Sequence, residues 1–257
     1  MENNAIEVKG LSFAYGKNRV LKDISIKIPE GKITTIMGAN GCGKSTLFGL
    51  MTRNLFPGKG KILLRGKNIQ RFRLPEFARN VSIVHQNNTC ADDITVEELV
   101  ALGRTPYQKM LGSKSTEDKE IIKRALEVTG LTEYSMREVG RLSGGQRQRV
   151  WIAMALAQNT KILFLDEPTT YLDIRYQLDI LKLIKSLNEE YGITIIMVLH
   201  DINQAIHFSD YIIGMKDGKA LFEGKPYDVI TGESVEKLYG VKLDVENIKG
   251  KKFVLTI

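Results

Sequence analysis

Alternating hydrophobic and polar positions mark the first part of the chain. This period of two predicts β-strands over residues 6–13 and 20–28, closed by a turn at 29–31. A further hairpin is expected over 58–69, turning at 65–68. Together these segments predict an antiparallel β-subdomain.

Short segments rich in apolar and β-branched residues, which are typical of strands buried on both faces, follow later in the chain. They lie at residues 32–37, 81–84, 162–165 and 193–198. The pattern predicts a helix over 174–191, between the last two segments. This strand–helix–strand order implies a parallel sheet with right-handed crossovers. A meander over 211–223 and a tail from 226, with short helices and a final hairpin, complete the prediction.

A helical period takes over from about residue 92 to 157. One helix is expected to begin at Thr95, where the spacing T-x-x-E forms a capping box. Two more are expected over 115–129, ending before Gly130, and over 143–157. The hydrophobic pattern therefore predicts an α/β core that is interrupted by an inserted helical subdomain.

The length of 257 residues suits one large α/β domain or two tightly joined lobes. We predict a single domain whose core spans about 1–91 and 158–225. The helical subdomain spans about 92–157, and a C-terminal tail spans about 226–257.

The net charge of +7 bears on the choice of partners. Lysine and arginine residues are scattered along the chain, which favours an ordinary solvated surface, and we predict no nucleic-acid partner. The longest apolar stretch, 193–199, is far shorter than the roughly 20 residues that cross a bilayer. Residues 1–4 show neither the basic region nor the apolar core of a secretory signal, so a cytoplasmic protein is expected.

Cysteine and histidine residues are few in this sequence. Cys42 and Cys90 are expected to be free thiols. The three histidines, His85, His200 and His207, argue against a histidine-rich metal site.

The run from Gly38 to Ser45 carries the strongest chemical signal. It matches the phosphate-binding pattern G-x-x-x-x-G-K-[ST], with a predicted strand before it and a predicted helix after it. Such a turn presents backbone N–H groups and the positive end of a helix dipole to phosphate oxygens. Lys44 would reach the β- and γ-phosphates, and Ser45 would ligate Mg²⁺. An ordinary glycine loop is the alternative, but the flanking strand and helix favour nucleotide binding. The predicted nucleotide-binding residues are Gly38, Asn40, Gly41, Cys42, Gly43, Lys44, Ser45 and Thr46.

Acidic and imidazole side chains follow two of the buried strands. Asp166 and Glu167 come directly after the strand 162–165, at the strand end where parallel sheets bind ligands. Asp166 is suited to holding Mg²⁺, directly or through water, and Glu167 to polarising an attacking water. A helix cap is the alternative, and the phosphate loop favours catalysis. His200 follows the strand 193–198 and is placed to contact the γ-phosphate.

The motif from Leu142 to Gln146 discriminates best between functions. Ser143 and Gln146 fit the capping box S-x-x-Q, and Gly144 and Gly145 expose backbone N–H groups at a helix start. A merely well-capped helix is the plain interpretation. The chain has only one phosphate loop in its sequence, so a second helix start suited to an anion has another explanation. We expect this helix start to complete the nucleotide site of another copy of the chain.

With these motifs, the sequence resembles the ATP-binding subunits of ABC transporters over essentially its whole length. The phosphate loop, Asp166-Glu167 and the signature LSGGQ occur in the family's order. Further matches are Gln86 for the Q-loop glutamine, Tyr171-Leu172-Asp173 for the D-loop, His200 for the switch histidine and Tyr15 for the aromatic that stacks on adenine. The resemblance implies an α/β P-loop NTPase core of the RecA-like type, with an antiparallel β-subdomain and an inserted helical subdomain. It implies ATP and Mg²⁺ as cofactors.

The resemblance also implies roles for these residues. Two copies would enclose two ATP molecules head to tail. The resemblance assigns catalysis to Glu167 and His200, and it adds Tyr15 and Gln86 to the nucleotide-binding residues. It assigns Mg²⁺ binding to Ser45, Gln86 and Asp166. Contact with the ATP of the partner copy is assigned to Ser143, Gly144, Gly145 and Gln146, and a dimer contact to Asp173. Two positions depart from the family pattern. Cys42 stands where serine is common, in a position that contributes mainly backbone, and His85 precedes Gln86 where proline is frequent.

Segments 95–107, 148–158 and 166–173 are similar to one branch of the family, the importers of iron–siderophore, haem and vitamin B12. This implies an ATPase that energises uptake through separate integral membrane permease subunits, with a substrate-binding protein as an indirect partner. It would be peripheral on the cytoplasmic face of the membrane. A soluble ABC ATPase acting in iron–sulphur cluster assembly is the alternative. A DNA-repair ATPase is a third class whose long coiled coil is missing here, and the presence of Glu167 and His200 disfavours an inactive regulator.

Overall fold

The computed structural model describes residues 3–107 and 115–255. Its contacts divide the chain into two compact units, Met1–Arg71 with Thr194–Ile257, and Phe72–Ile193. The predicted helical subdomain, 92–157, falls within the second unit. Its residues 108–114, and the chain ends 1–2 and 256–257, lie outside the described residues. The division into core, insertion and tail remains a prediction.

An antiparallel sheet in the first unit follows from the alternating segments. Its strand order is β2-β1-β4-β5. The strands are β1 (Asn4–Tyr15), β2 (Asn18–Pro29), β4 (Lys59–Leu64) and β5 (Lys67–Asn68). Every second residue of a segment such as Ile24, Ile26 and Ile28 is buried, because alternate side chains share one face of a sheet. The predicted antiparallel β-subdomain is confirmed.

The parallel strands of the first unit are two of the predicted buried segments and the first strand of the predicted meander. β3 (Ile33–Met37) pairs in parallel with both β8 (Thr194–Val198) and β9 (Tyr211–Lys216), and β10 (Lys219–Gly224) pairs antiparallel with β9. All residues of β3 and β8 are buried, which explains why their sequences show no alternation.

Two helices of this unit directly follow parallel strands. They are α1 (Lys44–Met51), after β3, and α7 (Ile202–Phe208), after β8. The first matches the predicted helix after the phosphate loop. The second has no counterpart among the predicted helices.

The C-terminal tail also belongs to the first unit, and it forms the short helices and the final hairpin that the sequence predicts. Its elements are α8 (Pro226–Val229), α9 (Gly232–Tyr239), β11 (Asp244–Ile248) and β12 (Lys251–Leu255). The hairpin turns at Lys249 and Gly250, and β12 packs against α7.

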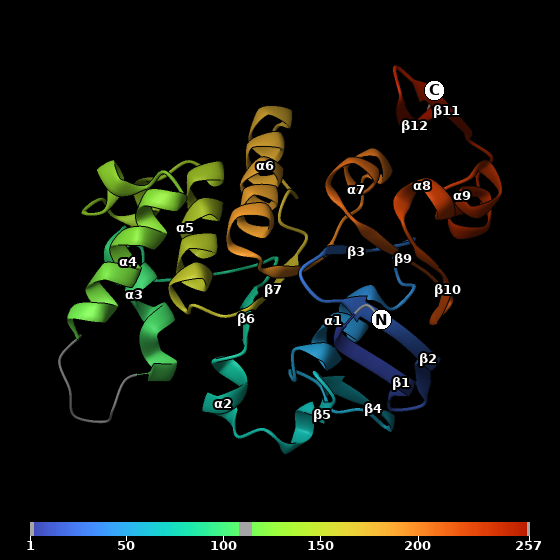
Figure 1. Ribbon diagram of the computed structural model, residues 1–257, viewed down its shortest axis with the longest axis horizontal. Coiled ribbons are helices and arrows are strands. Elements are labelled where there is room, and N and C mark those ends of the chain that lie inside the picture. The colour runs from blue at the N-terminus through green and yellow to red at the C-terminus, as the bar shows by residue number, and fades with distance from the viewer. Residues whose placement is uncertain (1–2, 108–114, 256–257) are drawn as a thin grey trace. The chain divides into compact units, whose positions relative to one another are not determined.

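Helices dominate the second unit, beside two parallel strands. β6 (Val81–Val84) pairs with β7 (Ile162–Asp166), and both strands were predicted. The helices are α2 (Leu74–Ala78), α3 (Val96–Ala101), α4 (Thr116–Val128), α5 (Gly144–Ala157) and α6 (Ile174–Tyr191). Short 3₁₀ turns lie at Leu102–Tyr107, Thr132–Tyr134 and Val139–Arg141. α3, α4 and α5 lie together in Figure 1 and share one hydrophobic core.

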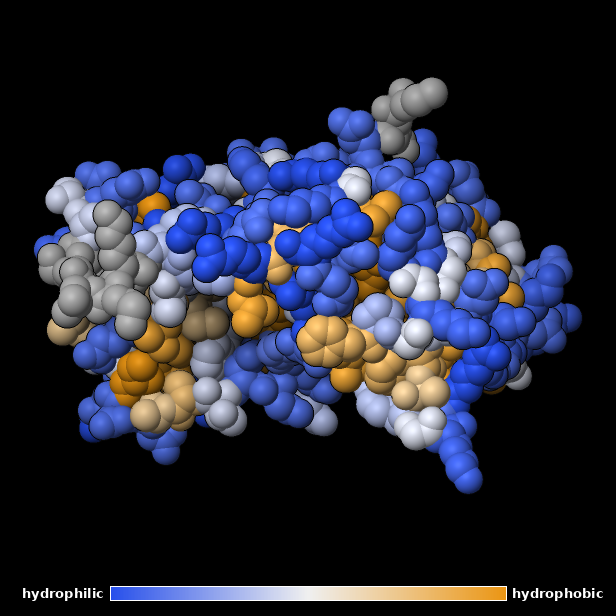
Figure 2. Space-filling view, turned by 90° about the horizontal axis from the view of Figure 1, so that it is seen from below, coloured by the Kyte–Doolittle hydropathy of each residue, from blue (hydrophilic) through white to orange (hydrophobic). Residues whose placement is uncertain are grey.

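Local side chains fix where three of these helices begin. Thr95, Ser115 and Ser143 each accept a hydrogen bond from a backbone N–H three residues on, and the side chain at that position returns to the backbone N–H of the cap. Within residues 3–107 and 115–255, none of the helices combines the length and the apolar composition that a membrane span needs. The face shown in Figure 2 is largely hydrophilic, with hydrophobic residues in small patches.

Candidate functional site

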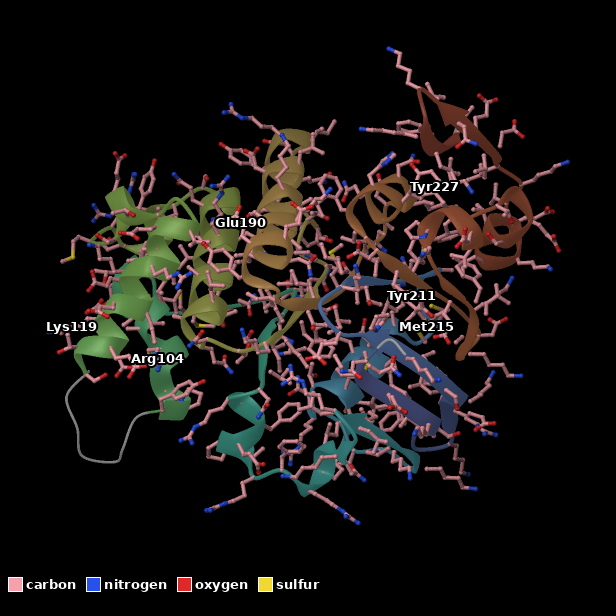
Figure 3. All side chains as sticks on the ribbon, in the orientation of Figure 1. Arg104, Lys119, Glu190, Tyr211, Met215 and Tyr227 are labelled. Carbon is pink, nitrogen blue, oxygen red and sulfur yellow. The ribbon has the colours of Figure 1, made fainter. Side chains whose placement is uncertain are left out.

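The phosphate loop connects β3 to α1 in a conformation that needs glycine at two positions. Gly38 has φ +148°, and a Cβ there would lie 2.2 Å from the carbonyl oxygen of Met215, which is labelled in Figure 3. Gly43 has φ +106°, and a Cβ there would lie 2.6 Å from a methyl carbon of Leu21. The positive φ and the close neighbours together favour glycine at both positions.

The Lys44 side chain connects the two ends of the phosphate loop. It is buried, and its Nζ donates hydrogen bonds to the carbonyl oxygens of Gly38 at 2.8 Å and Ala39 at 3.1 Å. The helix α1 begins at Gly43 with no side chain capping its first N–H groups, unlike the helices that begin after Thr95 and Ser143. A helix start of this kind is suited to a phosphate group.

The other predicted loop residues divide into two groups. Asn40, Gly41 and Ser45 are exposed, while Cys42 and Thr46 are buried. Burial raises the pKa of the Cys42 thiol, against the opposing charge of Lys44. This agrees with a position that contributes its backbone rather than a reactive thiolate.

The turn between β9 and β10 forms a hydrogen bond to the phosphate loop. The Gly218 N–H donates to the Cys42 carbonyl oxygen at 3.1 Å, and the Lys22 N–H donates to the Gly218 carbonyl oxygen at 2.8 Å. A Cβ on Gly218 would lie 2.1 Å from the Val20 carbonyl oxygen, so this turn also needs glycine. The sequence pattern did not reveal this support.

His200 lies at the same sheet edge as the phosphate loop. It is exposed and follows β8, and β8 pairs in parallel with β3 so that Ile36 faces Val198. The carboxyl ends of both strands therefore point the same way, as expected for a ligand-binding edge. Tyr15, at the end of β1, is 53% exposed, and its ring meets Phe13 edge to face at 4.8 Å. Its free face could stack on a planar base.

In the second unit, Gln86 and Glu167 contact each other. Gln86 Nε2 donates to Glu167 Oε2 at 2.7 Å, and Thr170 Oγ1 donates to the same oxygen at 3.1 Å. The pairing of β6 with β7 explains this contact, since Val84 faces Leu165 and the two residues follow their strands at one edge. Asp166 is the last residue of β7, and Glu167 takes a left-handed φ of +50°. Strained backbone at a non-glycine residue often marks a functional position. The sequence did not reveal the role of Thr170.

The signature motif lies against the D-loop segment. The capping box is present, with Ser143 Oγ accepting from the Gln146 N–H at 3.3 Å and Gln146 Oε1 accepting from the Ser143 N–H at 3.0 Å. Gly144 is exposed, whereas Gly145 is buried so tightly that a Cβ would lie 2.7 Å from the Tyr176 ring. Asp173 caps α6 by accepting from the Tyr176 N–H at 3.1 Å. The start of α5 is therefore packed against the start of α6.

The residue types predicted to hold Mg²⁺ suit this ion. The hydroxyl of Ser45, the amide oxygen of Gln86 and the carboxylate of Asp166 are each hard oxygen ligands, the kind that Mg²⁺ prefers. In the part of the chain that the structure describes, no three His, Cys, Asp or Glu side chains form a metal cluster.

Comparisons with known proteins agree with this picture. The family model described as ABC transporter matches residues 21–170. The ferric enterobactin transport ATP-binding protein FepC of Escherichia coli (strain K12) is 45% identical over 232 residues, which cover 90% of this chain and 86% of FepC. The iron(3+)-hydroxamate import ATP-binding protein FhuC of Bacillus subtilis (strain 168) is 45% identical over 242 residues, which cover 94% and 90%.

A solved structure is similar in fold. The dimeric post-hydrolysis state of the ATP-binding cassette MJ0796, bound to ADP and Pi, superposes with a TM-score of 0.74 at 31% identity. The match covers 86% of this chain and 98% of that chain.

The fold and the phosphate loop define an α/β nucleotide-binding protein of the P-loop NTPase class. The chain belongs to the ABC transporter family, among its ATP-binding proteins. Proteins of this group are ATPases, so the chain is an ATPase by class.

Proposed function

We propose that this protein binds and hydrolyses ATP to energise an importer whose substrate is an iron–siderophore, haem or cobalamin type of molecule. The observation that carries the proposal is the phosphate loop, closed by buried Lys44 and leading into an uncapped helix start. Relatives named for ferric enterobactin transport and iron(3+)-hydroxamate import support the transport role. They do not favour the alternative of a soluble ATPase in iron–sulphur cluster assembly.

Each residue has a role in this proposal that follows from its chemistry. Backbone N–H groups of the phosphate loop and Lys44 bind the phosphates, and Tyr15 stacks on the base. Ser45, Gln86 and Asp166 would hold Mg²⁺, and the ion would neutralise phosphate charge. Glu167 polarises the attacking water, and His200 contacts the γ-phosphate.

The signature motif is the reason that the proposal includes a second subunit. Ser143, Gly144, Gly145 and Gln146 begin α5, with Ser143 and Gly144 exposed and Gly145 buried, and Asp173 begins the neighbouring helix. We assign this surface to the ATP bound by a second subunit, as supported by the dimeric cassette of similar fold. The remaining partners are integral membrane permease subunits, with a substrate-binding protein acting through them. Docking on the permease would place the protein at the cytoplasmic face of the membrane.

Substitution of Glu167 tests the ATPase assignment. Glu167→Gln keeps the shape of the side chain and its contact with Gln86, but it removes the carboxylate. We expect ATP binding and ATP-dependent dimers with turnover lost, and Glu190→Gln, an exposed control, should hydrolyse ATP like the wild type. Wild-type turnover in Glu167→Gln would exclude this residue as the catalytic carboxylate.

Purification from detergent-solubilised membranes tests the importer. A polytopic membrane protein at stoichiometric amounts supports the proposal, whereas soluble scaffold proteins would support the iron–sulphur alternative. The reconstituted complex should then be tested for uptake of siderophores, haem and cobalamins.

A further inference from the structure

One side chain of α7, that of Asn203, connects this helix to the C-terminal hairpin. Its amide both donates a hydrogen bond to the backbone of β12 and accepts one from it. Asn203 Nδ2 donates to the Val254 carbonyl oxygen at 3.0 Å, and the Val254 N–H donates to Asn203 Oδ1 at 2.9 Å. The two bonds use one donor and one acceptor of the amide, so its orientation is fixed. They connect residues 51 positions apart in the sequence.

Apolar and basic side chains hold the hairpin in the same place. Phe253 packs on the His207 ring with a centroid separation of 4.7 Å, and Val254 is buried. On the other side, Lys252 Nζ donates to the carbonyl oxygens of Tyr227 at 2.6 Å and Ile230 at 2.8 Å. Tyr227, which is labelled in Figure 3, lies beside the hairpin. The hairpin is therefore a fixed support.

The helix that receives this support begins immediately after His200. Asp201 caps α7 by accepting from the Gln204 N–H at 2.8 Å. The far end of α7 is held on β3, where Ser209 shares a hydrogen bond of 2.6 Å with Thr35 and Asp210 accepts from the Ile33 N–H at 2.9 Å. Asn203 lies in the first turn of α7 and connects that end of the helix to the hairpin. It thus fixes the end of α7 that leads from His200.

We propose that Asn203 is a positioning residue for His200, and that it acts through the β11–β12 hairpin. The inference rests on the proposed function, because it assigns the role of the hairpin to ATP hydrolysis at His200. Loss of the two amide hydrogen bonds lets the first turn of α7 move, and the imidazole moves with it. Nucleotide affinity is set by the phosphate loop, which Lys44 and Gly218 hold by separate contacts.

Substitution of Asn203 in the full chain tests the proposal, with Asn247→Ala as the matched control. Asn247 is an exposed residue of β11, on the same hairpin. We expect Asn203→Ala to lower kcat about 3- to 10-fold while KM for ATP stays within about twofold, because one or two lost hydrogen bonds correspond to changes of this size. Phe253→Leu, which loosens the hairpin from its apolar side, should give the same split. A loss of ATP affinity in Asn203→Ala, or wild-type kcat, would overturn the proposal.

A second measurement does not depend on activity. The chain has three histidines, so their side-chain NMR signals can be assigned by substitution. We expect the His200 signal to shift or broaden in Asn203→Ala, to stay in place in Asn247→Ala, and the His85 signal to stay in place in both. An unchanged His200 signal in Asn203→Ala overturns the proposal even if the chain proves not to hydrolyse ATP. Absence of ATPase activity in the wild type, with a shifted His200 signal, would contradict only the proposed function.

Discussion

Gln86 donates a hydrogen bond from Nε2 to Glu167 Oε2 at 2.7 Å, across two neighbouring parallel strands. The carboxylate that we assign to water activation is therefore oriented by the residue that we assign to Mg²⁺ binding. With Nε2 engaged in this way, the amide oxygen of Gln86 is the atom suited to a cation. The Gln86 side chain thus connects the proposed Mg²⁺ binding with the proposed water activation.

Removal of the Gln86 side chain should reduce turnover. In Gln86→Ala, Glu167 keeps the Thr170 hydroxyl as a donor but loses the amide, so its carboxylate becomes less well oriented. Hydrogen bonds to charged groups contribute about 1.5–3 kcal/mol, which corresponds to a fall in kcat of roughly 10- to 100-fold. ATPase kinetics would measure this, with the exposed neighbour Asn87→Ala as the control. Equal kcat for both variants would contradict the orienting role.

Replacement of Lys44 by Met should weaken nucleotide binding. Met keeps much of the buried apolar volume but provides no donor for the Gly38 and Ala39 carbonyl oxygens, and no charge for phosphate. We expect ATP affinity to fall at least about tenfold, which is about 1.4 kcal/mol. Titration with a fluorescent ATP analogue would measure it, and Lys32→Met, at an exposed position before the same strand, should bind like the wild type.

Local signals explain what the sequence could predict. The strand 81–84 coincides with β6, and the helix starts after Thr95, Ser115 and Ser143 coincide with the structure. A capping box lies within four residues, so its geometry needs nothing from the rest of the chain.

Long-range contacts explain what the sequence could not predict. The helix α7 has seven residues, and the groups that fasten it are the Thr35 hydroxyl on β3 and the Val254 backbone on β12. The left-handed φ of Glu167 and its contact with Gln86, 81 positions away, likewise depend on how strands pair. The resemblance predicted the roles of these two residues, but only the fold shows their contact.

Two adjacent glycines of the signature motif should respond differently to alanine. A Cβ at Gly145 would lie 2.7 Å from the Tyr176 ring, whereas at Gly144 the nearest atom, in Leu172, is 3.6 Å away. Overpacking of this kind costs typically about 1–3 kcal/mol, so Gly145→Ala should lower the free energy of unfolding by that amount. Gly144→Ala should fold with nearly wild-type stability. Denaturant unfolding measures both variants, and equal stability would show that Tyr176 can move aside.

The phenol of Tyr239 should make the protein less stable at high pH. Burial raises the pKa of Tyr239 to about 12, the nearby Cys42 charge adds to this, and the Gly38 backbone opposes it. The unfolded chain loses this proton near its ordinary pKa of about 10, while the folded chain keeps it. The stabilisation is therefore complete below about pH 10 and is lost as the pH rises towards about 12.

Tyr239→Phe isolates this contribution, because phenylalanine fills the same site and has no proton to lose. Urea unfolding at several pH values between about 9 and about 12 should show a shallower loss of stability in Tyr239→Phe than in the wild type. Tyr171→Phe, the same change at a position that is 90% exposed, serves as the matched control. If the wild type and Tyr239→Phe lose stability in parallel, the phenol titrates as it does in water, and α9 does not bury it against the phosphate loop.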